Sequence, residues 1–404
     1  MPRDRVRVLH VITRLVVGGA QENTLLTAAH LDPARYEVTL ASGPTVGPEG
    51  SLEDRVPATS AFVRIPDLVR APHPVRDLSA LAHLYALMRR GRYHIVHTHT
   101  TKAGLLGRIA ARLARVPIVL HTPHGHAFHD YLNRPGSAGL CRLERGLARW
   151  TDQIICLTEA ERDDHLRLRI GPPERFTVIH SGVDVDRFRD ARPDVRAKRR
   201  ELGLPPSGPL VGCVARLVPV KGVQHLLEAV PGIRVGVPDA TVVYVGDGAL
   251  RPDLERRAAA LGVNGSVVFL GLRRDVPEIM PIFDLVVLPS MNEGMGKAAV
   301  EAMAAGRAVI GSRISGIQDV VTDGETGELV PPGDPNALAA AIVRGLADPP
   351  RARAMGLRAQ ARTDPYSIET MMVKIDHLYT RWLAAKGWPH SSSGGSPAHR
   401  VPSR

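Results

Sequence analysis

Leu285-Val286-Val287-Leu288-Pro289-Ser290-Met291-Asn292-Glu293-Gly294-Met295-Gly296-Lys297 is the stretch that decides the fold, and it continues as Ala298-Ala299-Val300-Glu301-Ala302-Met303-Ala304-Ala305-Gly306. The apolar run 285–288 predicts a buried parallel strand. Residues 292–296 form a polar, glycine-rich turn, and residues 297–305 are rich in strong helix formers. A strand, a glycine turn and a helix N-terminus together predict an anion site, because free backbone N–H groups and the helix dipole favour negative charge there.

Two carboxylates bracket this predicted anion site. Glu293 lies in the turn, and Glu301 lies one helical turn past the helix start, roughly 6 Å further along the axis. Carboxylates accept hydrogen bonds from sugar hydroxyls, so the pattern suits a ligand that carries both phosphate and hydroxyl groups. The alternative is that both glutamates are solvated charges at a helix end.

Glu293 and Glu301, with Gly294 and Gly296 between them, resemble the E-x7-E signature of the family-four retaining glycosyltransferases. Segments 309–312, 315–321, 324–327 and 330–334 are also similar to that family, and the resemblance covers about residues 5 to 385. It implies the GT-B fold, in which two Rossmann-like α/β domains face each other across a cleft that binds a nucleotide-sugar. It further implies that Glu293 orients the donor sugar, that Glu301 holds the ribose hydroxyls, and that donor contacts come from Gly294, Met295, Gly296 and Lys297.

Length and composition agree with a two-domain globular protein. A chain of 404 residues is too long for one ordinary core. We expect a first domain over 1–185, a second over 186–365, a helix crossing back over 366–385, and a disordered low-complexity tail over 386–404. Cys141, Cys156 and Cys213 are scattered, which predicts buried thiols in a reducing compartment.

Targeting and charge patterns narrow the function classes. The N-terminus leads into a strand-like run and not a signal peptide, and no apolar stretch approaches the ~18 residues needed to span a bilayer. We therefore expect a cytoplasmic protein. The net charge of +11 points to acidic partners. An aromatic content of 4% and the lack of a recognisable nucleic-acid motif argue against nucleic acid as that partner.

Strand and helix patterns alternate along the first half, which predicts a parallel sheet with helices on both faces. The strand Val6–Ile12 leads to Gly18 and Gly19 and then a helical pattern, an arrangement that suits close approach of the backbone to a phosphate. A glycine pair often marks only a tight turn. In the family that this chain resembles, it lies under the donor diphosphate.

Residues 121–129 contain four histidines. A transition-metal site is one interpretation, because imidazole is a common ligand, but a segment that runs through Pro and Gly gives no regular ligand spacing. The resemblance instead implies that one histidine at this strand end faces the donor sugar. His124 matches best, and His121 and His126 remain open.

Basic residues recur at helical spacing in the same half. Each set falls on one face of a predicted helix; the two sets are Arg108, Arg112 and Arg115, and Arg142, Arg145 and Arg149. One interpretation is a solvated face. The other is a patch for an anionic membrane surface or a lipid-diphosphate acceptor, where each cation contributes roughly 1 kcal/mol.

The second half adds a second cationic motif at a strand end. Arg216 and Lys221 follow the strand-like run 210–215, where ligands of open α/β sheets bind, so they can converge on a pyrophosphate. The resemblance implies that this pair neutralises the leaving diphosphate and that the loop carrying Arg273 holds the nucleobase through its backbone. Asp184 and Asp186 imitate a metal-binding D-x-D triplet, but they lie in a linker-like segment that we interpret as a turn.

We therefore predict a metal-independent retaining glycosyltransferase that uses a nucleoside-diphosphate sugar. The acceptor class is a saccharide or a lipid-linked saccharide, and the enzyme is expected in the cytoplasm or on the inner face of the membrane. The expected catalytic residues are His124, Glu293, Arg216 and Lys221. Alternatives are a sugar-nucleotide epimerase of the same fold, a non-catalytic binding module, and a Rossmann oxidoreductase. The last is disfavoured because the G-x-G-x-x-G fingerprint is absent after 241–245.

Overall fold

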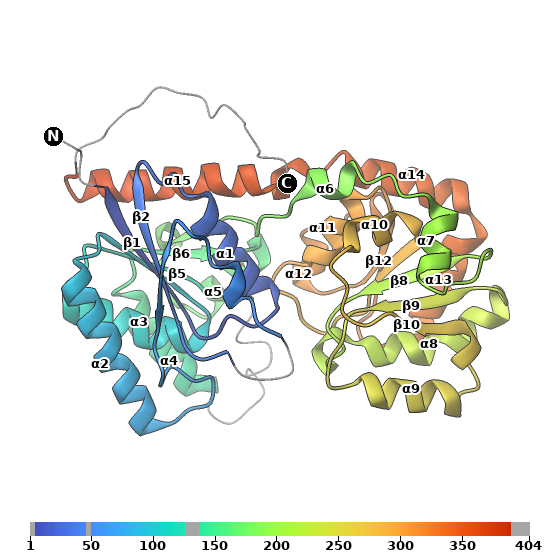
Figure 1. Cartoon of the computed structure of the whole chain (residues 1–404), viewed down its shortest axis with the longest axis horizontal. Coiled ribbons are helices and arrows are strands. Elements are labelled where there is room, and N and C mark those ends of the chain that lie inside the picture. Colours follow the sequence, from blue (N-terminus) through green and yellow to red (C-terminus); the bar gives the residue numbers. More distant parts are fainter. Residues whose placement is uncertain (1–4, 46–49, 126–136, 389–404) are drawn as a thin grey trace.

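The computed structural model describes residues 5–45, 50–125 and 137–388, and these form two lobes, each built on one parallel sheet (Figure 1). The first lobe holds a 7-stranded sheet in the order β3-β2-β1-β4-β5-β6-β7, and the second a 6-stranded sheet in the order β10-β9-β8-β11-β12-β13. The strands of the first sheet are β1 (Val6–Ile12), β2 (Tyr36–Ser42), β3 (Ala61–Arg64), β4 (Ile95–His99), β5 (Ile118–Thr122), β6 (Gln153–Cys156) and β7 (Phe176–Val178). Those of the second are β8 (Leu210–Val214), β9 (Thr241–Val245), β10 (Val267–Phe269), β11 (Leu285–Leu288), β12 (Ala308–Ser312) and β13 (Gly327–Val330).

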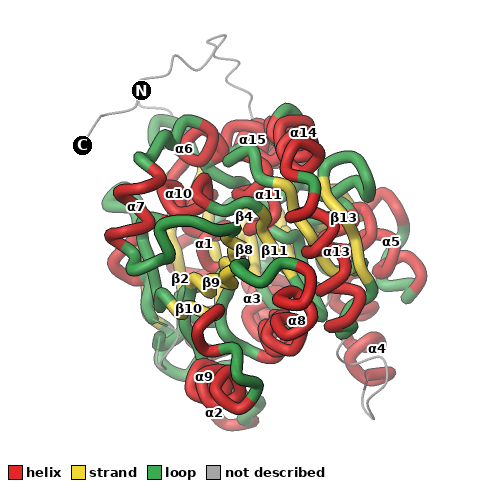
Figure 2. The backbone as a smooth tube through the Cα atoms, turned by 90° about the vertical axis from the view of Figure 1, so that its right-hand side faces the viewer, coloured by secondary structure: helices red, strands yellow, loops and turns green. Residues whose placement is uncertain are grey.

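Helices pack on both faces of each sheet, and Figure 2 shows the strands in the middle of the molecule with helices around them. The first lobe contains α1 (Gly19–His30), α2 (Pro74–Gly91), α3 (Thr101–Ala114), α4 (Ser137–Ala148) and α5 (Glu159–Arg167). The connection and the second lobe contain α6 (Val185–Arg189), α7 (Val195–Glu201), α8 (Val223–Gly236), α9 (Arg251–Ala260), α10 (Val276–Ile279), α11 (Lys297–Ala304), α12 (Ser315–Gln318), α13 (Pro335–Ala347) and α14 (Pro349–Gln360). The last helix, α15 (Ile368–Ala385), returns to the first lobe (Figure 1).

Both sheets have the strand order that creates a ligand site between two central strands. β1 lies between β2 and β4, and β8 lies between β9 and β11. In each sheet, the chain continues from the central strand to the neighbour on one side and later returns to the neighbour on the other side. A crevice therefore opens beyond the carboxyl ends of these strands. The glycine turn after β1, the Arg/Lys segment after β8 and the Glu293 turn after β11 all follow such ends.

The two faces of the first sheet are covered by different parts of the chain. Leu9 and Val11 pack with residues of α2 and α3. Val8, one residue away and therefore on the opposite face, packs with residues of α1 and with Ile375 and Tyr379 of α15. The first lobe thus uses the C-terminal helix to complete its core.

Most predicted elements occur in the structure, and one helix runs further than expected. The strands predicted at 6–12, 241–245 and 285–288 are present with those bounds. Proline usually ends or kinks a helix, yet α8 runs through Pro231 and continues to Gly236. A Cβ at Gly236 would lie 2.6 Å from Val343 of α13. The part of α8 that follows Pro231 therefore packs closely against α13.

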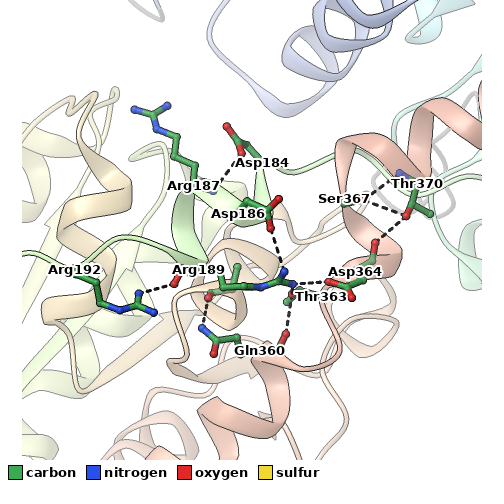
Figure 3. A network of polar contacts seen from close by, with 11 residues as sticks. Asp184, Asp186, Arg187, Arg189, Arg192, Gln360, Thr363, Asp364, Ser367 and Thr370 are labelled. Atoms are coloured by element: carbon green, nitrogen blue, oxygen red, sulfur yellow. Dashed lines mark hydrogen bonds and ion pairs between the residues drawn. The ribbon is translucent and has the colours of Figure 1, made fainter. Parts of the chain in front are cut away.

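The two crossings between the lobes are joined to each other, as Figure 3 shows. Val183 donates its N–H to the Tyr366 carbonyl at 2.9 Å, and the Arg189 guanidinium donates to Asp186 at 3.1 Å and to Thr363 at 3.0 Å. It also pairs with Asp364.

The Asp184/Asp186 triplet has a structural role in this region. The Asp184 carboxylate accepts from the Arg187 N–H at 3.3 Å and caps α6, and Asp186 lies inside that helix. The segment is a helix start and not the predicted turn.

The connection from β7 to β8 contains the predicted boundary at 185/186, and α15 lies within the predicted return segment. Residues 386–388, assigned to the tail by sequence, are placed. The Trp388 ring packs on His94 with centroids 4.0 Å apart, and Lys386 pairs with Asp152 at 3.1 Å. The remainder of the predicted tail lies outside the described residues.

The three cysteines are buried free thiols, as expected. Among the helices that the structure describes, none is both long and apolar enough to cross a membrane.

Candidate active site

The Arg/Lys segment and the glycine turn meet through an ion pair. The Lys221 ammonium lies 2.7 and 2.8 Å from the two carboxylate oxygens of Glu293, and the Ser290 hydroxyl donates to the same carboxylate at 2.7 Å. The Glu293 side chain is only 11% exposed. The neighbouring strands β8 and β11 bring these groups together from positions 72 residues apart in the chain. Partial burial and three short hydrogen bonds fix the carboxylate in one orientation.

His124 faces this turn from the first lobe. It follows β5 in a left-handed conformation with φ of 63°. A Cβ added to Gly294 would lie 2.9 Å from the His124 carbonyl oxygen and 3.0 Å from the Gly125 Cα. The two lobes therefore touch at the predicted donor site, and only glycine fits at position 294.

A buried carboxylate that the sequence analysis missed holds the His124 loop. Glu161 of α5 is fully buried and accepts from the Gly125 N–H at 2.9 Å and from the Leu157 N–H at 2.6 Å. Leu157 directly follows β6, so Glu161 ties the ends of two neighbouring strands together. The local sequence shows only the Thr-x-x-Glu spacing of Thr158 and Glu161, which marks a helix N-terminus and gives no sign of the contact with Gly125.

The glycine pair after β1 lies opposite the start of α11. A Cβ at Gly19 would be 3.7 Å from Cδ of Lys297, and Lys297 pairs with Glu22 of α1 at 3.1 Å. Gly18 is the N-cap of α1. Two helix N-termini, one from each lobe, therefore face each other at the lobe junction, which is a favourable arrangement for an anion.

The residues of the turn that are predicted to contact the donor differ in the partners they have in the structure. The Gly296 N–H donates to the Gly316 carbonyl at 2.9 Å, so it is engaged within the second lobe. The Met295 side chain is 5% exposed and belongs to the hydrophobic core. Within the described part of the chain, no hydrogen bond occupies the N–H groups of Gly294 and Met295.

Glu301 is partly buried on α11. Burial raises the pKa of its carboxyl to about 7, the Lys297 ammonium opposes that rise, and the Glu22 carboxylate adds to it. The site thus contains a carboxyl group that changes charge near neutral pH.

We expect Glu301→Gln to stabilise the protein at alkaline pH. The folded protein keeps the Glu301 proton up to about pH 7, whereas an unfolded chain releases it near pH 4.5. The stability that this proton confers is therefore complete below pH 4.5 and lost as the pH rises through 7. Relative to wild type, the glutamine variant should gain on the order of 1–3 kcal/mol at pH 8 and nothing at pH 4.5. Denaturant unfolding at both pH values measures this, with exposed Glu174→Gln as control, and an equal gain at both pH values would contradict it.

The other two histidine candidates, His121 and His126, differ from His124. His121 is buried beneath α3, where its ring bonds to the Thr98 hydroxyl at 2.9 Å and packs on Gly104, so it does not face the junction. His126 lies outside the described residues. Among the histidines that the structure describes, His124 is the one whose backbone meets the turn carrying Glu293.

Arg216 and Arg273 occupy different places. Arg216 lies two residues after the end of β8 and is partly buried. Arg273 follows the edge strand β10, and its guanidinium bonds to Asp275 at 2.7 and 2.8 Å and to Glu201 at 3.1 Å. The structure thus brings Lys221 to Glu293 but leaves the Arg273 side chain in a separate ion-pair cluster.

The structure removes one residue from the predicted basic faces of α3 and α4. Arg108 is fully buried, and its guanidinium donates to both Glu144 oxygens at 2.8 Å and to the Gly104 carbonyl at 2.8 Å. It joins α3 to α4 and is not part of a surface patch. Helical spacing predicted the face of α3 on which Arg108 lies, but it could not predict that α4 covers this residue. Arg112, Arg115, Arg142, Arg145 and Arg149 are exposed.

Comparison with known proteins agrees with this architecture. Residues 17–187 match the family model described as Glycosyltransferase Family 4, and residues 194–362 match Glycosyl transferases group 1. The chain is 32% identical over 344 residues to the UDP-Gal:α-D-GlcNAc-diphosphoundecaprenol α-1,3-galactosyltransferase of Escherichia coli, which covers 84% of this chain and 88% of the relative. It is 27% identical to the D-inositol 3-phosphate glycosyltransferase of Corynebacterium glutamicum (strain R), covering 91% and 92%.

Solved structures share the whole fold. Anabaena HepE, crystallised with UDP-glucose, superposes with a TM-score of 0.78 at 24% identity and covers 93% of this chain and 100% of its own. Sucrose-phosphate synthase from Thermosynechococcus elongatus gives 0.78 at 23% identity, covering 94% and 100%. Two facing Rossmann-like lobes with this strand order define a GT-B glycosyltransferase. The chain belongs to the family-four glycosyltransferases.

Proposed function

We propose that this glycosyltransferase transfers a hexose from a UDP-sugar to a lipid-linked or free saccharide, with retention of anomeric configuration and without a metal. The observation that carries the proposal is the Lys221–Glu293 pair, held at a strand end opposite His124. A cation and free turn amides suit the diphosphate, and an oriented carboxylate suits the sugar hydroxyls. The E. coli relative, whose name specifies UDP-galactose and a diphosphoundecaprenol acceptor, supports the donor and acceptor classes.

In the proposed reaction, the bond from the anomeric carbon to the β-phosphate oxygen breaks. The acceptor hydroxyl oxygen bonds to the same face of that carbon, and its proton passes to the departing diphosphate. Arg216 and Lys221 balance the charge that develops on the leaving group, and Glu293 and His124 orient the sugar. The lobe junction provides this countercharge from side chains and two helix N-termini, so the proposal requires no divalent ion.

A nucleotide-sugar panel in excess EDTA tests this proposal. We expect UDP-sugars to raise the melting temperature more than GDP- or ADP-sugars, because binding to the folded state adds about 2.7 kcal/mol at a hundredfold excess over Kd. NMR of the product formed on a lipid-diphosphate saccharide should show the anomeric configuration of the donor. An inverted product, or activity that returns only when a metal is restored, would overturn it.

We also propose that the exposed part of the α3–α4 surface contacts anionic lipid. Arg112, Arg115, Arg142 and Arg149 lie there together with exposed Leu113, Leu143 and Trp150. Cations attract the headgroups and the apolar side chains insert between them. Co-sedimentation with anionic but not neutral vesicles, weakened by changing the four arginines to glutamine, is the expected result. Equal binding by the fourfold variant would refute this role.

A further inference from the structure

An ion pair joins the two lobes at the candidate donor site. Lys297, the first residue of α11, places its Nζ 3.1 Å from a carboxylate oxygen of Glu22 in α1. The Lys297 side chain is 15% exposed, so its ammonium is largely shielded from water. The two residues are 275 positions apart in the chain and belong to different lobes. The pair therefore exists only while the lobes are together.

The Lys297 side chain lies over the glycine turn that is expected to take the donor diphosphate. A Cβ at Gly19 would be 3.7 Å from its Cδ. Burial has the largest effect on the pKa of His124 and on that of Glu301, and the Lys297 charge has the next largest effect on both. The ammonium is therefore close to the residues proposed to hold the sugar and the ribose.

A cation at the start of α11 is unfavourable by itself. A helix N-terminus has partial positive charge, which favours anions and disfavours cations. The first turn of α11 contains no acidic residue, whereas Glu22 lies in the first turn of α1, where a carboxylate is favoured. In the structure, a carboxylate from the other lobe thus balances the excess positive charge of Lys297. A diphosphate would meet the same need with more negative charge.

We propose that Glu22 pairs with Lys297 in the empty enzyme and that the donor diphosphate displaces Glu22 from it. The proposal rests on the proposed function, because it requires the diphosphate to bind at this junction. Glu22 is then an internal competitor of the donor and not a contact for it. After transfer, Glu22 returns to Lys297 as the nucleoside diphosphate departs, which favours release of the product.

The competing explanation is that the pair only holds the lobes together. Other contacts also join them: the Gly294 turn meets the His124 backbone, and the Asp319 carboxylate accepts from the Ala160 N–H at 3.3 Å. The two explanations predict opposite effects on nucleotide binding. Removing a competitor strengthens binding, whereas removing a contact that holds the two halves of the site together weakens it.

Isothermal titration calorimetry with UDP tests the proposal on wild type, Glu22→Gln, Lys297→Met and the double variant. Glu22→Gln should bind UDP about tenfold more tightly, the factor for a competitor that is engaged about nine-tenths of the time. Lys297→Met should bind UDP about tenfold more weakly, because one charge-assisted contact is lost. In the Lys297→Met background, Glu22→Gln should give no gain, because no ammonium is left to compete for.

Asp319→Asn is the matched control, since it removes an equal charge from another contact between the lobes. Its Kd for UDP should stay within twofold of wild type. A gain from Glu22→Gln that persists in the Lys297→Met background would be a general charge effect and would overturn the proposal. Weaker UDP binding by Glu22→Gln would also overturn it, and so would a Kd unchanged in both single variants.

The same series with GDP and ADP separates this proposal from the proposed function. If GDP or ADP, and not UDP, binds more tightly to Glu22→Gln, the role of Glu22 stands and the UDP assignment falls. If UDP binds with a Kd that does not depend on Glu22, the role of Glu22 falls and the UDP assignment stands. Binding of none of the three nucleotides to any variant would overturn both.

Discussion

Lys221→Ala is expected to lower kcat by about 10²–10³-fold, the usual cost of removing one group that stabilises charge in a transition state. Lys221 is the cation that the structure places on Glu293, at 2.7 Å, and negative charge grows beside it as the diphosphate leaves. Arg216→Ala should show a loss of the same order. Steady-state kinetics with a cognate donor measures both, and Arg256→Ala, which removes the same charge from the outer helix α9, is the control.

A double variant separates the two contributions of Lys221. Its removal also leaves the Glu293 carboxylate largely buried without its cation, which is costly in itself. If this were the only effect, Lys221→Ala combined with Glu293→Gln would recover most of the lost activity. We expect no recovery, because the leaving diphosphate would still lack its countercharge. Recovery to within tenfold of Glu293→Gln alone would contradict the assignment.

Gly294→Val should lower kcat/KM by about 10²-fold with little change in stability. Even one added carbon would lie 2.9 Å from the His124 carbonyl oxygen and 3.0 Å from Gly125, and both contacts are backbone atoms that cannot rotate away. The lobes must then separate, and a displacement near 1 Å between reacting groups costs about this factor. Kinetics together with thermal unfolding test it.

Gly265→Ala is the matched control for that experiment, since nothing lies within 4 Å of a Cβ at position 265. The clash at Gly294 is between lobes and not inside a core, so the melting temperature should stay close to that of wild type. Gly294→Val with activity within threefold of wild type would show that the lobe contact is not part of the working enzyme.

The sequence predicted strands and helices well where the local residue pattern alone identifies them. Buried parallel strands read as continuous apolar runs, so Leu285–Leu288 and Val6–Ile12 were identified with their bounds. Features that depend on which elements are neighbours were missed. Helical spacing put Arg108 on a common face with Arg112, but only the packing of α4 shows that Glu144 covers it.

Site residues divide in the same way. Glu293 and Lys221 were predicted from motifs at strand ends and His124 from the family resemblance, and the structure brings their segments together. The role of Glu161 could not be found, because its contacts to Gly125 and Leu157 depend on the packing of α5 against two strand ends. Glu161 and Gly125 are 36 residues apart in the chain, and the sequence shows only that Glu161 is near the start of a helix.

The return of α15 to the first lobe has a consequence for how the chain is made. A ribosome completes β1–β7 long before it reaches Ile375 and Tyr379, the residues that cover one face of that sheet. During synthesis, one apolar face of the first sheet therefore stays uncovered until α15 has been made. The strands of the second lobe, β8 to β13, are continuous in sequence, so that lobe can fold as it emerges. The half of the protein that is synthesised first is completed last.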